Sequence, residues 1–156
     1  MTRFDSRVLL SLLAAVAGLM VSASPAEAQV ACDGVTLGLI EGTNGEDTIF
    51  GTTGDDYING LAGDDLIFGG PLFTALAGND HLCGGSGKDT LHGGADNDRL
   101  FGDSGDDTLN GGSDNDELFG GSGDDTLNGD GGVDAGDGES GTDVCNVETP
   151  DVFNCP

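Results

Sequence analysis

Aspartate residues recur at a fixed interval along most of this chain. From Gly42 to Asn146 the sequence divides into eleven units of nine residues, interrupted once by Pro71–Leu76, and every unit has Asp at its sixth position. The eleven aspartates are Asp47, Asp56, Asp65, Asp80, Asp89, Asp98, Asp107, Asp116, Asp125, Asp134 and Asp143. A carboxylate is a hard oxygen ligand, and Ca²⁺ takes about six to eight oxygen atoms from carboxylates and carbonyls. This column of position-six aspartates therefore predicts binding of several calcium ions.

The alternative is that these aspartates are solvated turn residues, because Asp is common in turns. Further acids stand beside several of them at the fifth position: Glu46, Asp55, Asp64, Asp106 and Asp124. Packing so many like charges into adjacent turns without cations would be strongly repulsive. Zinc or copper would prefer nitrogen or sulfur ligands, which are scarce here.

Glycine and aliphatic residues form the other regular columns. Gly opens all eleven units and fills the fourth position in nine, with Asp96 and Asp114 as exceptions. Because Gly adopts positive φ readily and Asp tolerates it, we expect the first six residues of each unit to form a tight turn. Positions seven to nine then form a short strand, with position eight facing inward. The eighth residue is Ile or Leu in nine units: Ile49, Ile58, Ile67, Leu82, Leu91, Leu100, Leu109, Leu118 and Leu127.

One aliphatic side chain per unit cannot be buried alone, so stability must come from stacking of units. Alternate units are the most alike, which indicates a structural period of eighteen residues, with two units in each coil. Outward ladders should then follow at that spacing: Thr90, Thr108 and Thr126 with Asn110 and Asn128 on one face, Phe101 with Phe119 on the other, and Phe50 with Phe68 near the start. The last two units carry Gly136 and Cys145 at position eight and are expected to form a degenerate C-terminal cap.

These columns resemble the GGxGxDxUx nonapeptide of the repeat-in-toxin (RTX) family, over Gly42 to Asn146. The resemblance implies an all-β fold, a right-handed parallel β-roll (a β-solenoid) of about eleven nonapeptides. It also implies that calcium lies between successive turns, that each position-six Asp gives a carboxylate oxygen, and that turn carbonyls complete the shell. Because such sites do not exist in an unfolded chain, we expect calcium binding and folding to be coupled.

The first residues are a different kind of sequence. Arg3 and Arg7 precede an apolar stretch from Val8 to Val21, and Ala26-Glu27-Ala28 forms an A-x-A cleavage site. This pattern predicts a signal peptide over residues 1–28 and an extracellular, secreted protein. A membrane anchor is the alternative, but the apolar run is shorter than the roughly 20 residues that span a bilayer. The remaining chain then divides into an N-terminal cap (29–41), a calcium-binding β-roll (42–146) and a C-terminal tail (147–156).

The charge balance limits the possible partners. The chain has 29 acidic and 4 basic residues, and removing residues 1–28 removes two of each kind, so the mature charge stays at −25. Nucleic acid is excluded as a partner because phosphate binding needs basic residues. Anionic lipid is disfavoured for the same reason, and no later apolar segment approaches a membrane span. Calcium ions are the predicted partners, and no sequence feature identifies a protein or glycan partner.

The four cysteines all follow the predicted cleavage site. Their even number in a secreted protein suggests two disulfides. We favour Cys145–Cys155, which closes a short C-terminal loop, and Cys32–Cys83 by elimination. A cysteine metal site is the weaker alternative, because C-x-x-C spacing is missing.

No catalytic motif stands out. H-E-x-x-H and G-x-S-x-G are absent, which disfavours a metalloprotease or a serine hydrolase. His81 and His92 fall at outward strand positions without a sequence-indicated partner, and we interpret them as incidental surface residues. We therefore predict that the protein is not an enzyme. Two other interpretations stay open: a calcium-rigidified adhesion or matrix protein with exposed Phe ladders as a partner surface, and a Thr/Asn ladder that binds ice or glycan.

Overall fold

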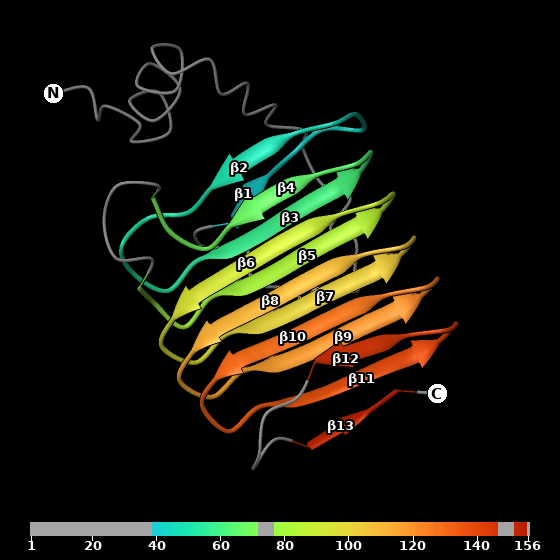
Figure 1. Ribbon diagram of the computed structural model, residues 1–156. Coiled ribbons are helices and arrows are strands. Elements are labelled where there is room, and N and C mark those ends of the chain that lie inside the picture. Colours follow the sequence, from blue (N-terminus) through green and yellow to red (C-terminus); the bar gives the residue numbers. More distant parts are fainter. Residues whose placement is uncertain (1–38, 72–76, 147–151, 156) are drawn as a thin grey trace, which may run out of the picture.

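A computed structural model describes residues 39–71, 77–146 and 152–155. These residues form two parallel β-sheets wound into a solenoid of about six turns, without a helix in this part of the chain (Figure 1). The seven-stranded sheet has the order β1 (Leu39–Glu41), β3 (Tyr57–Ala62), β5 (His81–Ser86), β7 (Arg99–Ser104), β9 (Glu117–Ser122), β11 (Ala135–Ser140) and β13 (Val152–Asn154). The six-stranded sheet has the order β2 (Thr48–Phe50), β4 (Leu66–Phe68), β6 (Thr90–Ala95), β8 (Thr108–Ser113), β10 (Thr126–Gly131) and β12 (Val144–Asn146).

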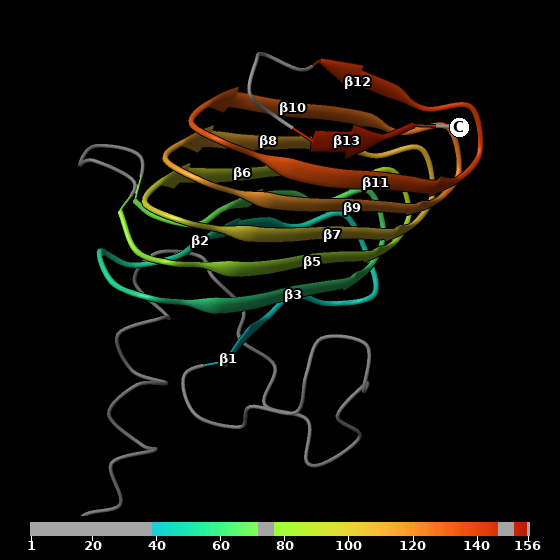
Figure 2. The same cartoon turned by 90° about the horizontal axis from the view of Figure 1, so that it is seen from below.

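The strands alternate between the sheets along the chain, so each coil contains two repeats (Figure 2). Within a sheet, neighbouring strands pair residues eighteen positions apart, as in Leu91 with Leu109. This register confirms the predicted coil and the predicted fold class, a parallel β-roll. Pairing across the insertion is preserved, because Ile58 pairs with Leu82 at a separation of 24 residues. Residues 72–76 themselves lie outside the described part of the chain.

The core is a single row of aliphatic side chains from each sheet. The nine predicted Ile and Leu residues are all buried, at 0–2% exposure, and Ile40 and Cys145 pack against the ends of the cluster. Flanking strand positions are more exposed, as Thr90 and His92 are beside Leu91. Because each coil buries one residue per sheet, no coil has a core without its neighbours.

The predicted turn of six residues is too long. In β6, as in most full-length strands, the first three residues of the next repeat, Gly93–Ala95, continue the strand, so only positions four to six turn the chain. Continuation is favoured because these residues pair with the next coil: Gly94 pairs with Gly112 and Ala95 with Ser113. Where Asp replaces Gly at position four, the expected left-handed conformation is confirmed, with φ of 75° at Asp96 and 78° at Asp114.

The last two repeats continue the roll as β11 and β12 although they lack the aliphatic residue. Strand β13 then pairs with the outer edge of β11. The predicted disulfide Cys145–Cys155 is confirmed and ties the chain end to β12. Cys83 is also disulfide-bonded, while Cys32, its predicted partner, lies outside the described residues. No described residue belongs to a helix that is long and apolar enough to cross a membrane.

The predicted outward ladders are confirmed. Thr90, Thr108 and Thr126 are in register on the six-stranded sheet, and Asn128 donates a hydrogen bond to Asn110 at 2.8 Å. Phe50 stacks on Phe68 at 5.1 Å between ring centroids, and Phe101 stacks on Phe119 at 4.9 Å.

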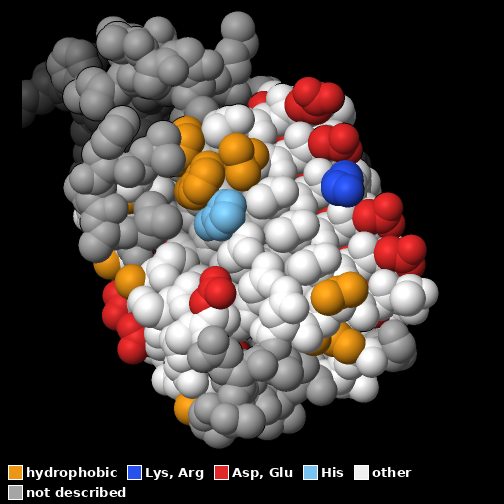
Figure 3. All heavy atoms as spheres, in the orientation of Figure 1, with side chains coloured by type: hydrophobic (Ala, Val, Ile, Leu, Met, Phe, Trp, Pro, Cys, Tyr) orange, Lys and Arg blue, Asp and Glu red, His pale blue; other side chains and the backbone are white. Residues whose placement is uncertain are grey.

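Both histidines are part of the stacked rows of aromatic side chains, the aromatic rows. The interpretation of His81 and His92 as incidental surface residues missed this role. His92 stacks on Phe68, and His81 stacks between Tyr57 and Phe101. Figure 3 shows hydrophobic side chains and a histidine gathered on one sheet face, where Phe50, Phe68 and His92 lie in neighbouring strands. Half-burial lowers the pKa of His92.

Candidate metal centre

The position-six aspartates form two rows, one along each edge of the roll where the chain turns from one sheet to the other. The first aspartate row precedes the strands of the six-stranded sheet and contains Asp47, Asp65, Asp89, Asp107, Asp125 and Asp143. The second aspartate row precedes the strands of the seven-stranded sheet and contains Asp56, Asp80, Asp98, Asp116 and Asp134. The structure thus divides one sequence column into two spatial rows.

Within each row, every aspartate is linked to the one in the adjacent coil. The carboxylate oxygen Oδ1 accepts the backbone N–H of the aspartate one coil earlier, as in Asp89 N–H to Asp107 at 2.7 Å and Asp98 N–H to Asp116 at 2.8 Å. Nine such bonds, 2.7–2.9 Å long, connect the eleven aspartates in the two rows. The second row keeps this bond as far as Asp134 and the first row as far as Asp143, so the degenerate last repeats retain the turn geometry.

The second carboxylate oxygen, Oδ2, is the unusual atom of the site. From Asp65 to Asp134 the aspartate side chains are only 0–3% exposed. The Oδ2 atoms of most of these aspartates are buried and accept no hydrogen bond from a described residue. This holds for Asp65, Asp80, Asp89, Asp98, Asp107, Asp116 and Asp125, and also for Asp143. A buried carboxylate without partners is costly unless it is neutralised or binds a cation. The rows therefore contain a series of unsatisfied, deeply placed oxygen ligands.

The opening glycine of each repeat makes room for this carboxylate. A Cβ atom at Gly102 would lie 2.5 Å both from Oδ2 of Asp107 and from the carbonyl oxygen of Gly120 in the next coil. None of the opening glycines has positive φ, so the conformational reason expected from the sequence is wrong at this position. Positive φ occurs instead at positions two and four, as at Gly85 and Gly87. The opening glycine is needed because carboxylate and backbone fill its side-chain space.

The buried carboxylates have strongly raised pKa values. Burial, reinforced at most sites by neighbouring carboxylates, raises the pKa from 3.8 to about 6 at Asp65 and Asp89, about 7 at Asp80, Asp107 and Asp116, and about 8 at Asp98. Burial also raises the pKa of Asp125. The ionised form is therefore disfavoured in these rows unless a positive charge compensates it.

The position-five side chains occupy the outer rim of the turns. They are exposed, and many accept a backbone N–H from the next coil, as Asp106 does from Asp124 at 3.1 Å and Asn97 from Asn115 at 3.1 Å. At Asp55, hydrogen bonds from the backbone and side chain of Asn79 lower the pKa. Acidic side chains with one basic side chain among them follow an edge of the roll in Figure 3. The rim acids thus join the coils, and the position-six aspartates provide the buried oxygens.

The donor set suits a hard cation. No group of three or more His, Cys, Asp or Glu side chains converges on one point within the described residues, so carboxylates alone would not fill a metal shell there. Calcium accepts carbonyl oxygens as readily as carboxylates, and these turns combine buried Oδ2 atoms with glycine-rich backbone. The residues present therefore fit calcium, with mixed carboxylate and carbonyl ligation, better than zinc or copper.

The fold and the turns define a class of protein, the parallel β-roll assembled from Gly/Asp nonapeptides. The family of the RTX calcium-binding nonapeptide repeat matches the chain in four copies, over residues 41–71, 74–109, 84–118 and 110–145. The chain belongs to this family, whose repeats imply Ca²⁺ binding and typically have a structural role instead of an enzymatic one. No curated protein matches the chain.

Proposed function

We propose that this is a secreted calcium-binding protein whose roll forms when Ca²⁺ binds its turns. The observation that carries the proposal is the pair of aspartate rows, in which buried Oδ2 atoms lack partners. Burial and nearby carboxylates raise the pKa of Asp98 to about 8, so ionisation of this side chain in the roll is unfavourable. A bound cation would remove that cost. Calcium would supply the compensating charge and draw adjacent coils together.

All eleven position-six aspartates are the proposed ligands, each through its carboxylate. The backbone carbonyls of Asp89 and Asp98 already accept an N–H from the next coil, at 2.9 Å in both cases. Carbonyl ligands would therefore come from other turn positions. If each ion bridges repeats that are two apart, eleven repeats offer about nine such pairs, which equals the number of aspartate-to-aspartate links. About nine divalent ions would leave the mature chain with a modest negative charge.

The proposed location is extracellular. Residues 1–28 are the proposed signal peptide, 29–41 an N-terminal cap, 42–146 the calcium-binding roll and 147–156 a C-terminal tail. The Cys145–Cys155 disulfide and the disulfide-bonded Cys83 agree with an oxidising compartment. The extracellular medium also supplies calcium at the level that weak modules require, about 10⁻⁴–10⁻³ M. The chain would thus stay unfolded until export and then fold on meeting calcium.

A calcium titration of the mature chain, beginning at Gln29, tests the proposal. Circular dichroism should change from unfolded to strand-rich as calcium rises, and calorimetry should report several ions per chain. Asp107→Asn removes the charge of a buried ligand and should shift the transition to higher calcium. Asp106→Asn is the matched control, because it removes a charge one residue away on the exposed rim. A strand-rich spectrum in excess chelator at about pH 8, where the aspartates are ionised, or equal effects of the two variants, would contradict the proposal.

A second candidate is an adhesion or matrix protein that uses calcium only for rigidity. The aromatic rows on the outer sheet faces favour it, because exposed aromatics can contact partners. The stacking of Phe101 on Phe119 is also explained by cross-strand stabilisation of the sheet alone, without a partner. A pull-down with and without calcium separates the two: a rigid adhesion protein captures a specific partner, whereas a protein whose only ligand is calcium captures none.

A further inference from the structure

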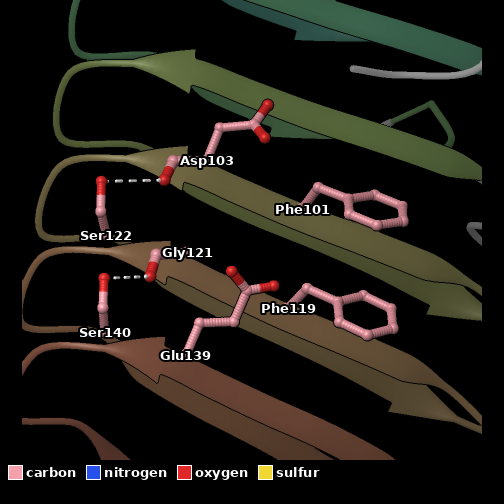
Figure 4. A pocket seen from close by; sticks show the side chains of 7 residues that line it. All are labelled: Phe101, Asp103, Phe119, Gly121, Ser122, Glu139 and Ser140. Atoms are coloured by element: carbon pink, nitrogen blue, oxygen red, sulfur yellow. Dashed lines mark hydrogen bonds between the residues drawn. The ribbon is translucent and has the colours of Figure 1, made fainter.

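A groove of about 240 Å³ lies on the outer face of the seven-stranded sheet (Figure 4). Gly121 on β9 lies at the middle of its lining. Asp103 on β7 and Glu139 on β11 pair in register with Gly121 on its two sides. The groove therefore lies along one ladder in which a glycine stands between two acidic residues.

The groove has one aromatic wall and one hydroxyl wall. The stacked rings of Phe101 and Phe119 form the first. Ser122 and Ser140 form the second, and Figure 4 shows each hydroxyl donating to a backbone carbonyl, of Asp103 at 3.5 Å and of Gly121 at 3.2 Å. Because the hydroxyls are held by backbone, the wall is defined before any ligand arrives.

The two acids of the groove are available to a ligand. Neither carboxylate has a hydrogen bond or an ion pair with another described residue, whereas the nearby Asp137 carboxylate accepts bonds from the Glu139 N–H and from Asn154. Burial, together with the Glu139 carboxylate, raises the pKa of Asp103. The mature chain has only Lys88 and Arg99 as basic residues, so a compensating cation must come from outside.

The same sheet face already contains one arginine held by this combination of groups. Arg99 pairs with Glu117 across neighbouring strands at 2.8 Å, and its guanidinium lies 5.9 Å from the centre of the Phe101 ring. A carboxylate and a phenyl ring are therefore sufficient to position a guanidinium on this surface. The groove offers a second set of these groups, Glu139 and Asp103 beside Phe119, without a resident cation.

The spacing favours a guanidinium over a metal ion. Asp103 and Glu139 stand two strands apart, which places their backbones about 9–10 Å apart. A calcium ion holds its ligands at about 2.3–2.6 Å, so the two carboxylates would have to meet at one point. A planar guanidinium presents donors along several edges and can bond two separate acceptors.

We propose that this groove binds an arginine side chain of a partner protein, with Asp103 and Glu139 as paired acceptors and the Phe119 ring beside the guanidinium. None of its residues is a position-six aspartate, although the Asp103 carboxylate is near enough to the first aspartate row to reinforce burial in raising the pKa of Asp89 and Asp107. The groove remains anionic after both aspartate rows are filled.

Titration of the calcium-saturated mature chain with a capped Gly-Arg-Gly peptide tests this proposal. Backbone NMR signals of Gly121, Ser122 and Ser140 should shift and saturate with the arginine peptide. They should not shift with the peptide in which neutral citrulline replaces arginine. The double variant Asp103→Asn/Glu139→Gln should bind between about twofold and thirtyfold more weakly, because each exposed ion pair contributes modestly.

Asp130→Asn is the matched control. Asp130 also occupies position two of its repeat, with φ of 66°, but lies on β10 in the opposite sheet. Its substitution should leave arginine binding unchanged. If the double variant does not become strand-rich in calcium, Glu139→Gln alone makes the same comparison. Equal shifts with citrulline, unchanged affinity in the variants, or saturable shifts with extra calcium that arginine cannot displace would overturn the proposal.

Discussion

The two glycines of one repeat provide a discriminating test of how the roll is held together. Gly51 belongs to the first column, which is Gly in all eleven units, and Gly54 to the fourth, which is Gly in nine, so the sequence suggests that both glycines matter. In the structure, a Cβ atom at Gly51 would overlap the carbonyl oxygen of Gly69 and lie 2.8 Å from Oδ2 of Asp56. A Cβ atom at Gly54 would meet nothing within 4 Å, and Gly54 has no positive φ. We therefore predict opposite effects for Gly51→Ala and Gly54→Ala.

The magnitudes follow from the two environments. Overpacking against backbone and a buried carboxylate should lower the free energy of unfolding by about 1–3 kcal/mol for Gly51→Ala. Gly54→Ala should raise it by about 0.4–1 kcal/mol, since alanine restricts the unfolded chain without straining the fold. The two variants should thus differ by about 1.4–4 kcal/mol. Gly51→Ala should also need more calcium to fold, because Asp56 must move.

Urea unfolding followed by circular dichroism in saturating calcium measures the first quantity, and the calcium midpoint of folding measures the second. The wild-type mature chain is the reference for both. Equal losses of unfolding free energy in the two variants would mean that both glycines are needed for their backbone conformation, and not because neighbouring atoms fill the side-chain space of Gly51. A Gly51→Ala variant as stable as the wild type would refute the steric account of the opening glycine.

Three further predictions concern the carboxylates, the core and the C-terminal end. Without calcium, the raised pKa values of Asp98 (about 8) and Asp107 (about 7) mean that the roll keeps protons that the unfolded chain loses near pH 4. The stability of the calcium-free roll is therefore greatest below about pH 4 and is lost as the pH rises toward 8. Circular dichroism without calcium should show more strand at about pH 5 than at about pH 8, and the reverse trend would contradict this prediction. Leu100→Ala, at 0% exposure, should cost about 2–5 kcal/mol in urea unfolding. The exposed control Val144→Ala, at 53%, should cost less than about 0.5 kcal/mol, and equal costs would argue against the buried row. Replacing both Cys145 and Cys155 by Ser should speed hydrogen exchange in β12 while leaving β6 unchanged, because coils contact only their neighbours; uniform exchange along the roll would contradict this.

Much of the fold was predictable because the repeat is periodic. The alternation of similar units gave the coil of two repeats, and the Ile/Leu column identified every residue of the buried row. These predictions succeed because a solenoid places residues by sequence spacing alone, and eighteen residues return the chain to the same sheet. Even the Asp at position 96, in a column of glycines, could be placed correctly from its tolerance of left-handed backbone.

Other features depended on the packing of one coil against the next. The sequence suggested turn flexibility for the opening glycine, but Gly102 is required because Asp107 and the next coil occupy its side-chain space. It also could not distinguish buried Asp107 from exposed Asp106, since both are acids in one turn. Nor could it show that Asp103 and Glu139, which are 36 residues apart in sequence, line one groove.

The period, the identity of the core residues and the supply of oxygen ligands can all be read from the amino-acid sequence. These are properties of spacing and residue type, and they recur in most coils. The packing of adjacent coils was needed to show that, from Asp65 to Asp125, Oδ1 accepts an N–H of the adjacent coil while Oδ2 accepts no hydrogen bond. At Asp47 and Asp56 the pattern differs, because Oδ2 accepts hydrogen bonds from Thr43 and Thr52. The groove likewise belongs to three neighbouring strands, and no single repeat contains it.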